Sequence, residues 1–413
     1  MTGSVKAPIG LTKFKTFCSL PWVNISVDPD GKVKPCCVST DFITDENGNP
    51  LNLGYHTIDK IYNSQSFQEI RRQMLSGEKV KGCQKCYAEE EFAGTSSRLM
   101  YNKMFQVNKP KTIVDNIDIK YFDLRFGNLC NLKCRTCNST ASNQIGKEIQ
   151  EIGLEKVKDF VTVNLSDMNS WYKTETFDNN LNSQLKNIKV VYLTGGEPTL
   201  SQENKNFLDR LVNVNTNITI KISSNLTNLN KEFYNLLSRF KKVIFFASID
   251  GYKEVQEYLR YPSNWEQIDE NLQSLLKLKN LKLFVSPVIQ IGNFNKLVEL
   301  FDYLDGFNHA NKKMVIEIDP LYLKYPSYFD IINLPLEYKL KCWNRIETWL
   351  QSCRYQSKNF KQKMMGLKEK CIVDVDDFSE LKKYKTYNDI LDQHRGHYLQ
   401  DVNPELNEIL NNI

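Results

Sequence analysis

Short apolar runs alternate with amphipathic segments through the middle of the chain. The runs have the length and the β-branched or aromatic content of buried strands, and we expect strands at residues 117–126, 188–193, 218–223, 243–249, 281–289 and 314–318. Between them apolar residues recur at helical spacing, which predicts helices near residues 203–213, 230–240, 264–278 and 294–306. Six strands that alternate with helices predict an α/β fold with a parallel sheet and right-handed crossovers.

A different pattern precedes this alternation. Apolar and polar residues alternate over residues 23–27, Asp28-Pro29-Asp30-Gly31 has turn chemistry, and residues 32–35 return, so we expect a β-hairpin. Helical spacing follows over residues 57–76 and 87–105. A further helix is predicted over residues 139–150, between the first and the second predicted strand of the alternation.

The alternation stops after Pro320, and residues 335–413 read as helices. The chain therefore divides by pattern into a small hairpin-and-helix part, an α/β part and a helical extension. We place these three parts at residues 1–112, 113–320 and 321–413.

Composition narrows the class of protein. The 413 residues include 54 Lys+Arg and 49 Asp+Glu, a net charge of only +5, and the charges are interspersed without a basic, aromatic stripe, so no nucleic-acid signal emerges. No apolar run approaches the roughly 20 residues of a membrane helix. Eleven cysteines without a recognisable export signal favour a reducing cytoplasm, where clustered cysteines hold metal more often than they form disulfides.

Three of these cysteines are clustered in one loop. Cys130, Cys134 and Cys137 follow the first predicted strand of the α/β part with three residues and then two between them. Three thiolates are one fewer than a closed [4Fe–4S] cube takes, which would leave one iron open to a ligand. A Cys₄ zinc site with its fourth ligand elsewhere, or unconnected buried cysteines, are the alternatives at this point.

The second strand of the α/β part ends in another compact motif. Thr194 is followed by Gly195, Gly196, Glu197 and Pro198. Two glycines let the backbone approach a ligand closely, the carboxylate of Glu197 accepts from a cation, and Pro198 stiffens the exit.

Together, CxxxCxxC after one strand and GGEP after the next resemble the radical S-adenosylmethionine (radical SAM) family. The resemblance implies an incomplete six-stranded (β/α)₆ barrel of the TIM type, a core [4Fe–4S] cluster on Cys130, Cys134 and Cys137, and S-adenosylmethionine on its open iron. In that family the GGEP loop receives the ammonium of the cofactor. One departure is Thr136, where the family usually has an aromatic residue; the backbone there meets the adenine.

Polar residues at the ends of the next strands extend the resemblance. Ser223 and Asn225 close the third strand, where short polar side chains suit the ribose hydroxyls. A helix N-cap is the alternative role, although Asn230 itself suits the cap of the next helix. On the fifth strand, Val288 or its neighbour Ile289 is expected to cover the adenine, unless it is simply part of the core.

Ser248, Asp250 and Arg260 form a SIDG-then-Arg pattern similar to the SPASM/twitch branch of the family. The resemblance implies contacts with the carboxylate and ribose of the cofactor, and the fixed fork of Arg260 suits the carboxylate. A surface ion pair of Arg260 with a nearby glutamate is the alternative.

The cysteines of the N-terminal part look like a twitch domain, half of a SPASM domain, which holds one auxiliary [4Fe–4S] cluster through four cysteines. The set is Cys18, Cys36 and the pair Cys83 and Cys86, and it precedes the barrel where most family members place it after. A Cys₄ zinc ribbon fits the spacing as well. Cys37 neighbours a ligand, but successive strand residues point apart.

The resemblance implies an enzyme with two [4Fe–4S] clusters and S-adenosylmethionine. Reductive cleavage of the cofactor gives a 5′-deoxyadenosyl radical that takes hydrogen from a substrate C–H, in an oxidation or a peptide or protein modification assisted by the auxiliary cluster. We expect a small-molecule or a peptide or protein substrate, an electron donor such as flavodoxin or ferredoxin, and no membrane. The alternative is a non-catalytic iron–sulfur or zinc-binding scaffold, which would not need the open-site set with Glu197.

Overall fold

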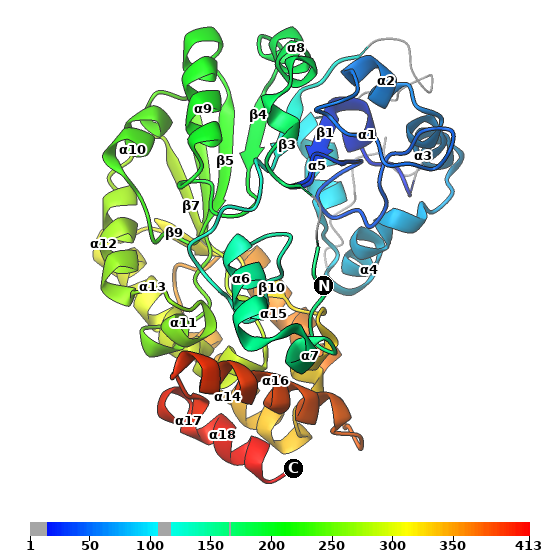
Figure 1. The fold of residues 1–413 in the computed structure, drawn as a ribbon. Helices are drawn as coiled ribbons and strands as arrows, with labels where there is room; N and C mark the ends of the chain where they lie inside the picture. The colour runs from blue at the N-terminus through cyan, green and yellow to red at the C-terminus, as the bar shows by residue number, and fades with distance from the viewer. Residues whose placement is uncertain (1–14, 106–116, 165–166) are drawn as a thin grey trace, which may run out of the picture. The chain divides into compact units, whose positions relative to one another are not determined.

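The computed structural model describes residues 15–105, 117–164 and 167–413 (Figure 1). These residues form two compact units. The first unit comprises the described residues up to 127 together with residues 167–192, and the second comprises residues 128–164 and 193–413.

A sheet in the order β2-β1-β3-β4 is the centre of the first unit. Its strands are β1 (Asn24–Val27), β2 (Val33–Lys34), β3 (Tyr121–Leu124) and β4 (Val190–Leu193). The predicted hairpin is confirmed, since β1 and β2 pair antiparallel with Val27 opposite Val33. In addition, β1 pairs parallel with β3, with Ile25 opposite Phe122, so the hairpin extends the sheet.

Polar residues on β1 concealed this second pairing. All four β1 residues are buried, including Asn24 and Ser26. Ser26 Oγ donates to Asp123 Oδ2 at 3.1 Å, and Asn24 Nδ2 donates to the carbonyl of Pro35 at 2.9 Å. Because these hydrogen bonds give the buried Ser26 hydroxyl and the Asn24 amide nitrogen a partner, a strand that alternates like a sheet edge lies inside the sheet.

Helices surround the strands of the first unit. They are α1 (Leu20–Val23), α2 (Ile58–Tyr62), α3 (Gln65–Ser76), the 3₁₀ turn η1 (Lys81–Cys83), α4 (Gln84–Ala93), α5 (Ser97–Phe105), η2 (Trp171–Lys173) and α8 (Glu175–Gln184). The two long helices expected at 57–76 and 87–105 are each divided. Ser64 caps α3 by accepting from Phe67 N, and Gly94 ends α4 at a left-handed φ of +64°.

The second unit contains four parallel strands in the order β5-β6-β7-β9. They are β5 (Thr219–Ser224), β6 (Lys242–Ala247), β7 (Leu281–Val285) and β9 (Ile316–Ile318), and β8 (Val288–Ile289) pairs with β10 (Leu321–Tyr322) beside them. Every second residue of β6 is buried, namely Val243, Phe245 and Ala247.

Helices α9 (Gln202–Val214), α10 (Lys231–Ser238), α12 (Trp265–Leu275) and α13 (Leu297–Asn311) cover one face of these strands (Figure 1). The unit also holds α6 (Asn143–Ile152), α7 (Leu154–Val157), α11 (Glu254–Leu259) and the 3₁₀ turns η3 (Ile291–Lys296), η4 (Ser327–Phe329) and η5 (Ile331–Asn333). The predicted strands and helices of the α/β part are thus confirmed in type, and the fold is α/β with a mostly parallel sheet.

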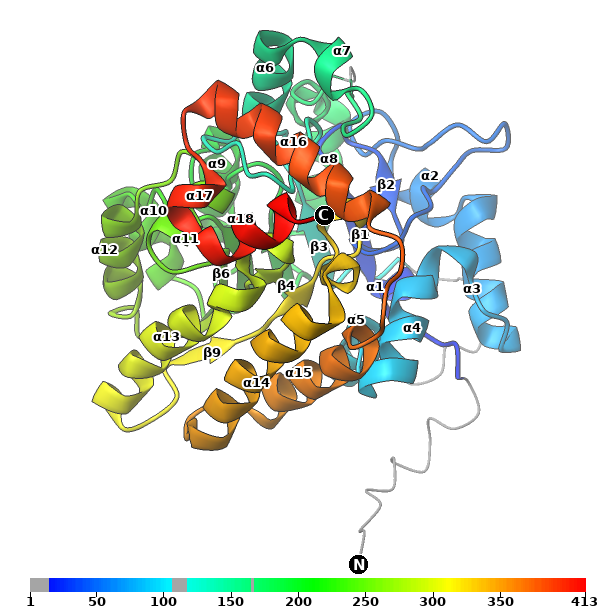
Figure 2. The same cartoon turned by 90° about the horizontal axis from the view of Figure 1, so that it is seen from below.

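The chain ends in the expected helical region. Its helices are α14 (Leu336–Ser352), α15 (Lys358–Cys371), α16 (Ser379–Arg395), α17 (Leu399–Val402) and α18 (Pro404–Asn411). Figure 2 shows α16 beside α17 and α18. Within the part of the chain that the structure describes, every helix is too short or too polar to cross a membrane.

Candidate active site

The loop with Cys130, Cys134 and Cys137 lies in the second unit and has no regular secondary structure. Hydrogen bonds therefore fix its shape. Cys130 N donates to Asn143 Oδ1 at the start of α6 at 3.0 Å, and Cys137 N donates to the carbonyl of Cys134 at 3.0 Å. The helix expected from Ser139 begins only at Asn143, because residues 138–141 form a turn instead.

The GGEP loop contacts the cysteine loop directly. Glu197 N donates to the carbonyl of Leu129 at 2.7 Å, one residue before Cys130. A Cβ on Gly196 would lie 2.1 Å from the same carbonyl oxygen, and Gly195 has a φ of +120°. Gly196 therefore permits the close approach of the two loops, and Gly195 permits the turn that precedes it.

Glu197 is 2% exposed and receives four hydrogen bonds from its own chain. Oε1 accepts from Thr199 N, Thr199 Oγ1 and Ser224 Oγ, whereas Oε2 accepts from Asn225 N at 2.7 Å. A carboxylate offers about four acceptor positions, so Oε2 has capacity for a further donor. Burial raises the pKa of Glu197, and the bonds from Thr199, Asn225 and Ser224 offset part of that rise.

The side chain of Asn225 points to the cysteine loop. Its Nδ2 donates to Asn131 Oδ1 at 3.0 Å, and Asn131 Nδ2 donates to Thr227 Oγ1 at 2.8 Å. The sequence singled out Ser223, but it is Ser224 that faces Glu197, and Ser223 is half-buried. Asn230 caps α10 as expected, by accepting from Phe233 N.

The buried Asp250 and the half-buried Arg260 form an ion pair beside the core cysteines. Arg260 Nε donates to Asp250 Oδ2 at 2.7 Å, and Arg260 Nη1 lies 4.0 Å from Cys134 Sγ. Val288 N donates to Asp250 Oδ1 at 2.7 Å, so the start of β8 lies beside this ion pair. Burial alone would lower the pKa of Arg260. The charges of Asp250 and Cys134 outweigh this effect and raise the pKa above its usual value, so the guanidinium stays charged.

Two polar residues that the sequence did not single out hold Asp250. Gln256 Oε1 accepts from Asp250 N at 2.7 Å, and Asn293 Nδ2 donates to the carbonyl of Asp250 at 2.7 Å. Three further residues that the sequence singled out, Ser248, Val288 and Thr136, are half-buried. Their contacts with a cofactor stay a prediction.

The core thiols are half-buried, and the Arg260 cation lies beside them. Burial raises the pKa of Cys134 to about 12 and that of Cys137 to about 11, and the Arg260 cation lowers both in part. Burial likewise raises the pKa of Cys130. Thiols with raised pKa values become thiolates when a metal centre supplies the compensating charge.

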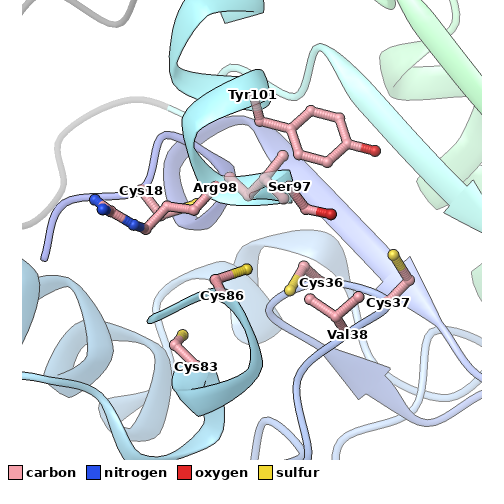
Figure 3. A pocket seen from close by; sticks show the side chains of 10 residues that line it. Cys18, Cys36, Cys37, Val38, Cys83, Cys86, Ser97, Arg98 and Tyr101 are labelled. Atoms are coloured by element: carbon pink, nitrogen blue, oxygen red, sulfur yellow. The ribbon is translucent and has the colours of Figure 1, made fainter. Parts of the chain in front are cut away.

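The predicted auxiliary cysteines line one pocket of the first unit (Figure 3). Cys18 precedes α1, Cys36 follows β2, Cys83 ends η1 and Cys86 lies on α4. Figure 3 shows the sulfur atoms of these four residues turned toward a common space, while Cys37 lies to the side of them. The prediction that Cys36 and Cys37 point apart agrees with this view.

Arg98 on α5 is a member of this pocket that the sequence reading missed. It is buried, its Nη1 donates to the carbonyl of Phe17 at 2.7 Å, and its Nε donates to Glu90 Oε1 at 2.9 Å. Burial raises the pKa of both Cys18 and Cys83 to about 12, and the Arg98 cation opposes the rise.

Gly82 lets the segment after Cys36 pack closely on the backbone next to Cys83. A Cβ on Gly82 would lie 2.8 Å from both Ser39 Oγ and Asp41 Oδ2, so the segment after Cys36 packs on the backbone next to Cys83. Among the residues the structure describes, no three cysteine, histidine or acidic side chains already enclose a single metal ion. Ligands of a four-iron cube each bind a different iron and need not converge on one point.

Comparisons with known proteins agree with the motifs. Residues 124–304 match the radical SAM superfamily, and residues 18–87 match SPASM, an iron–sulfur cluster-binding domain. Among proteins with curated functions, none matches this chain.

Solved structures give distant likenesses. The crystal structure of Streptococcus suis SuiB has 13% identity, covers 78% of this chain and 70% of its own, and gives a TM-score of 0.35. SuiB bound to its precursor peptide SuiA has 12% identity, coverages of 87% and 78%, and a TM-score of 0.32. Native anSMEcpe with bound AdoMet has 17% identity, coverages of 57% and 62%, and a TM-score of 0.34. With TM-scores below 0.5, we assign nothing to this chain from them.

The donors present fit the groups that these domains imply. A radical SAM domain implies a [4Fe–4S] cluster and S-adenosylmethionine, and a SPASM domain implies auxiliary iron–sulfur clusters. The second unit offers three soft thiols beside Arg260, and the first offers four beside Arg98. The chain therefore carries a radical SAM domain over residues 124–304 and, ahead of it, an iron–sulfur cluster-binding domain of the SPASM type over residues 18–87.

Proposed function

We propose that this enzyme takes a hydrogen atom from a substrate C–H and completes an oxidation with the help of its auxiliary cluster. When bound, the core cluster and S-adenosylmethionine together supply a 5′-deoxyadenosyl radical by reductive cleavage. Cys130, Cys134 and Cys137 would hold the core cluster, and Cys18, Cys36, Cys83 and Cys86 the auxiliary one.

The observation that carries this proposal is the junction between the two motif loops. The hydrogen bond from Glu197 N to Leu129 O fixes the buried carboxylate next to the cysteine loop. Oε2 of Glu197 retains acceptor capacity, which suits the ammonium of S-adenosylmethionine. A scaffold that merely held a metal would need neither the buried acceptor nor the missing fourth thiol.

Arg260 supports the same proposal from the other side of the loop. Its guanidinium bridges Asp250 and Cys134, so one side chain is placed to stabilise a thiolate ligand and to meet a carboxylate. Asp250 keeps this charge compensated in the buried site. We propose that Arg260 orients the carboxylate of the cofactor.

The electrons balance if the auxiliary cluster accepts one. An external donor of the flavodoxin or ferredoxin type supplies one electron to cleave the cofactor to methionine and the 5′-deoxyadenosyl radical. That radical takes a hydrogen atom from the substrate and becomes 5′-deoxyadenosine. The substrate radical then loses one electron to the auxiliary cluster and one proton to solvent, so cofactor reduction and substrate oxidation cancel.

A double variant tests the role of the auxiliary cluster. Cys83→Ala with Cys86→Ala should leave cleavage of S-adenosylmethionine intact, because cleavage needs the core cluster alone. Oxidised product should fall sharply, because the substrate radical has no acceptor and is quenched by returning hydrogen. The measurement is the ratio of 5′-deoxyadenosine to oxidised product in a single turnover, with substrate drawn from cell extract separated into peptide and small-molecule fractions.

The matched control replaces Cys342 and Cys353, two buried thiols of the C-terminal helical region outside both clusters. This variant should keep the wild-type ratio. An unchanged ratio in a folded Cys83/Cys86 variant that has lost the auxiliary cluster would remove the redox role. The fraction that yields product decides between a peptide and a small-molecule substrate.

A further inference from the structure

The C-terminal helix α16 reaches the cysteine loop through one buried arginine. Arg135 follows Cys134 directly, and its side chain is fully buried. Its Nη1 donates to Asn388 Oδ1 at 2.8 Å, and its Nη2 donates to Asp392 Oδ1 at 2.6 Å. Both acceptors lie on α16, more than 250 residues along the chain.

The same arginine is bound to the end of α11. Arg135 N donates to the carbonyl of Leu259 at 3.0 Å, and Nε donates to the carbonyl of Tyr258 at 3.0 Å. The guanidinium carbon lies 3.5 Å from the centre of the Tyr258 ring. Every described bond of this side chain therefore joins the cysteine loop to α11 or α16, and none of them reaches solvent.

Asp392 is fully engaged in this contact. Its Oδ2 accepts from Tyr258 Oη at 3.2 Å and from Leu399 N at 2.8 Å, while its Oδ1 accepts from Arg135. Asn388 is fixed in turn, because its Nδ2 donates to the carbonyl of Tyr384 at 2.8 Å. Both acceptors are thus also held by hydrogen bonds to residues other than Arg135.

A second arginine of α16 holds the residue before Cys134. Arg395 Nη2 donates to the carbonyl of Lys133 at 2.7 Å. Its Nε and Nη2 donate to the two carboxylate oxygens of Glu148 on α6 at 2.8 and 2.7 Å. The two residues on either side of Cys134 are therefore both tied to α16.

We propose that α16 holds the core cysteine loop in the shape that the cluster requires, and that Arg135 is the positioning residue through which it acts. This inference rests on the proposed function, since it concerns the same core cluster. The loop has no backbone ladder of its own, so its shape depends on such contacts. Arg135 also fixes the carbonyls at the end of α11, directly before Arg260, which approaches Cys134 from the other side.

The proposal predicts an effect on the core cluster alone. Arg135→Met removes the fork and leaves Asp392 buried without its cation, while Arg135→Lys keeps the charge but cannot reach both α11 and α16. Partners behind metal ligands typically contribute about ten- to a hundredfold to metal affinity. We therefore expect Arg135→Met to lose core iron to a chelator about ten- to a hundredfold more readily, and Arg135→Lys to fall in between.

The experiment uses the full chain, reconstituted anaerobically, with and without the Cys83→Ala and Cys86→Ala changes. In that background only the core cluster contributes to the electron paramagnetic resonance spectrum. The readouts are iron retained against a chelator and the change in this spectrum when S-adenosylmethionine is added. Arg135→Met should weaken both, while the variant with intact Cys83 and Cys86 keeps about four irons in its auxiliary cluster.

The control is Arg345→Met, which removes an exposed arginine–carboxylate contact between α14 and Glu405 on α18, away from the cysteine loop. It should behave as wild type. Asn388→Leu removes only one acceptor of Arg135, and it guards against a misfolded Arg135 variant; it should shift both readouts in the same direction by less. If Arg135→Lys and Asn388→Leu match Arg345→Met in both readouts, the positioning role is wrong.

These readouts separate this proposal from the proposed function. Iron retention and the spectrum report on the loop whether or not the enzyme turns over. Wild-type protein that holds its core cluster but cleaves no S-adenosylmethionine would overturn the proposed function and leave the role of α16 standing. Equal iron retention in all variants would overturn the role of α16 alone.

Discussion

Glu197 joins three segments of the second unit through its carboxylate and its backbone amide. Donors come from Thr199 just beyond the motif and from Ser224 and Asn225 at the end of β5, and the backbone amide of Glu197 donates to the carbonyl of Leu129. Such a side chain has a structural task as well as the ligand-binding task that the motif implies. Variants at this position therefore have to preserve shape while removing charge.

Glu197→Gln is the variant that meets this condition. It keeps the volume of the side chain but replaces a charge-assisted acceptor, so affinity for S-adenosylmethionine should fall while both clusters remain. A hydrogen bond to a charged group contributes about 1.5–3 kcal/mol, roughly ten- to a hundredfold in affinity. Equilibrium binding measures this, with the exposed Glu270→Gln on α12 as a control of equal chemistry. Equal dissociation constants for the two variants would take Glu197 out of the site.

Affinity should also depend on pH through the same carboxylate. Burial raises the pKa of Glu197, so it takes up a proton at a higher pH than an ordinary glutamate. Only the ionised form accepts from an ammonium, and affinity should fall by about tenfold for each pH unit below that raised pKa. Binding isotherms across the acidic range test this. A profile that is the same in wild type and Glu197→Gln would contradict it.

At the residue scale the sequence predicted motif residues better than their supporting neighbours. Cys130, Glu197 and Arg260 are recognisable because their chemistry and spacing are specific. Arg98 and Ser224 carry no such pattern, since a single arginine on a charged helix and one of two adjacent serines look like many others. Only the fold shows that they face Cys18 and Glu197.

At the element scale the strands were predictable because short runs rich in β-branched or aromatic residues recur between segments with helical spacing. The predicted 218–223 is Thr219–Ser224, and 243–249 is Lys242–Ala247. The predicted ends of helices were wrong where a capping residue begins a new helix. Ser64, for example, caps the start of α3 inside the single helix expected over residues 57–76. The pairing of β1 with β3 was not predicted, because the buried Ser26 finds its hydrogen-bond partner, Asp123, 97 residues along the chain.

The approach of the two motif loops gives a prediction about elements. Gly196→Ala would place a Cβ 2.1 Å from the carbonyl oxygen of Leu129, a backbone atom that cannot rotate away. The loops must then separate, and overpacking of this kind costs about 1–3 kcal/mol. We expect weaker retention of the core cluster and weaker cofactor binding, measured by iron content and equilibrium binding.

The control for this variant is Gly306→Ala on α13, where nothing lies within 4 Å of the new Cβ. Alanine is favoured over glycine inside a helix by about 0.5–1 kcal/mol, so this change should raise the midpoint of thermal unfolding and leave the clusters intact. If Gly196→Ala matches Gly306→Ala in iron content and in cofactor binding, the close contact between the loops is not needed for the site.

At the scale of the whole molecule, the sequence could not predict the link between the cysteine loop and the C-terminal helices. Arg135 and Asp392 are 257 positions apart, and each looks like an ordinary charged residue. The division into residues 1–112, 113–320 and 321–413 stays a proposal, and its first boundary lies at residues outside the described part of the chain. The α/β class was predictable because it depends on the order of elements alone.

The central claim is that three cysteines and one buried glutamate make a site that cleaves S-adenosylmethionine. The measurement is the amount of 5′-deoxyadenosine formed when reconstituted protein is reduced in the presence of S-adenosylmethionine. We predict formation by wild type and none by the variant in which Cys130, Cys134 and Cys137 are all alanine, although that variant keeps its auxiliary iron. No 5′-deoxyadenosine from wild type with its core cluster intact, or equal amounts from both proteins, would contradict the account.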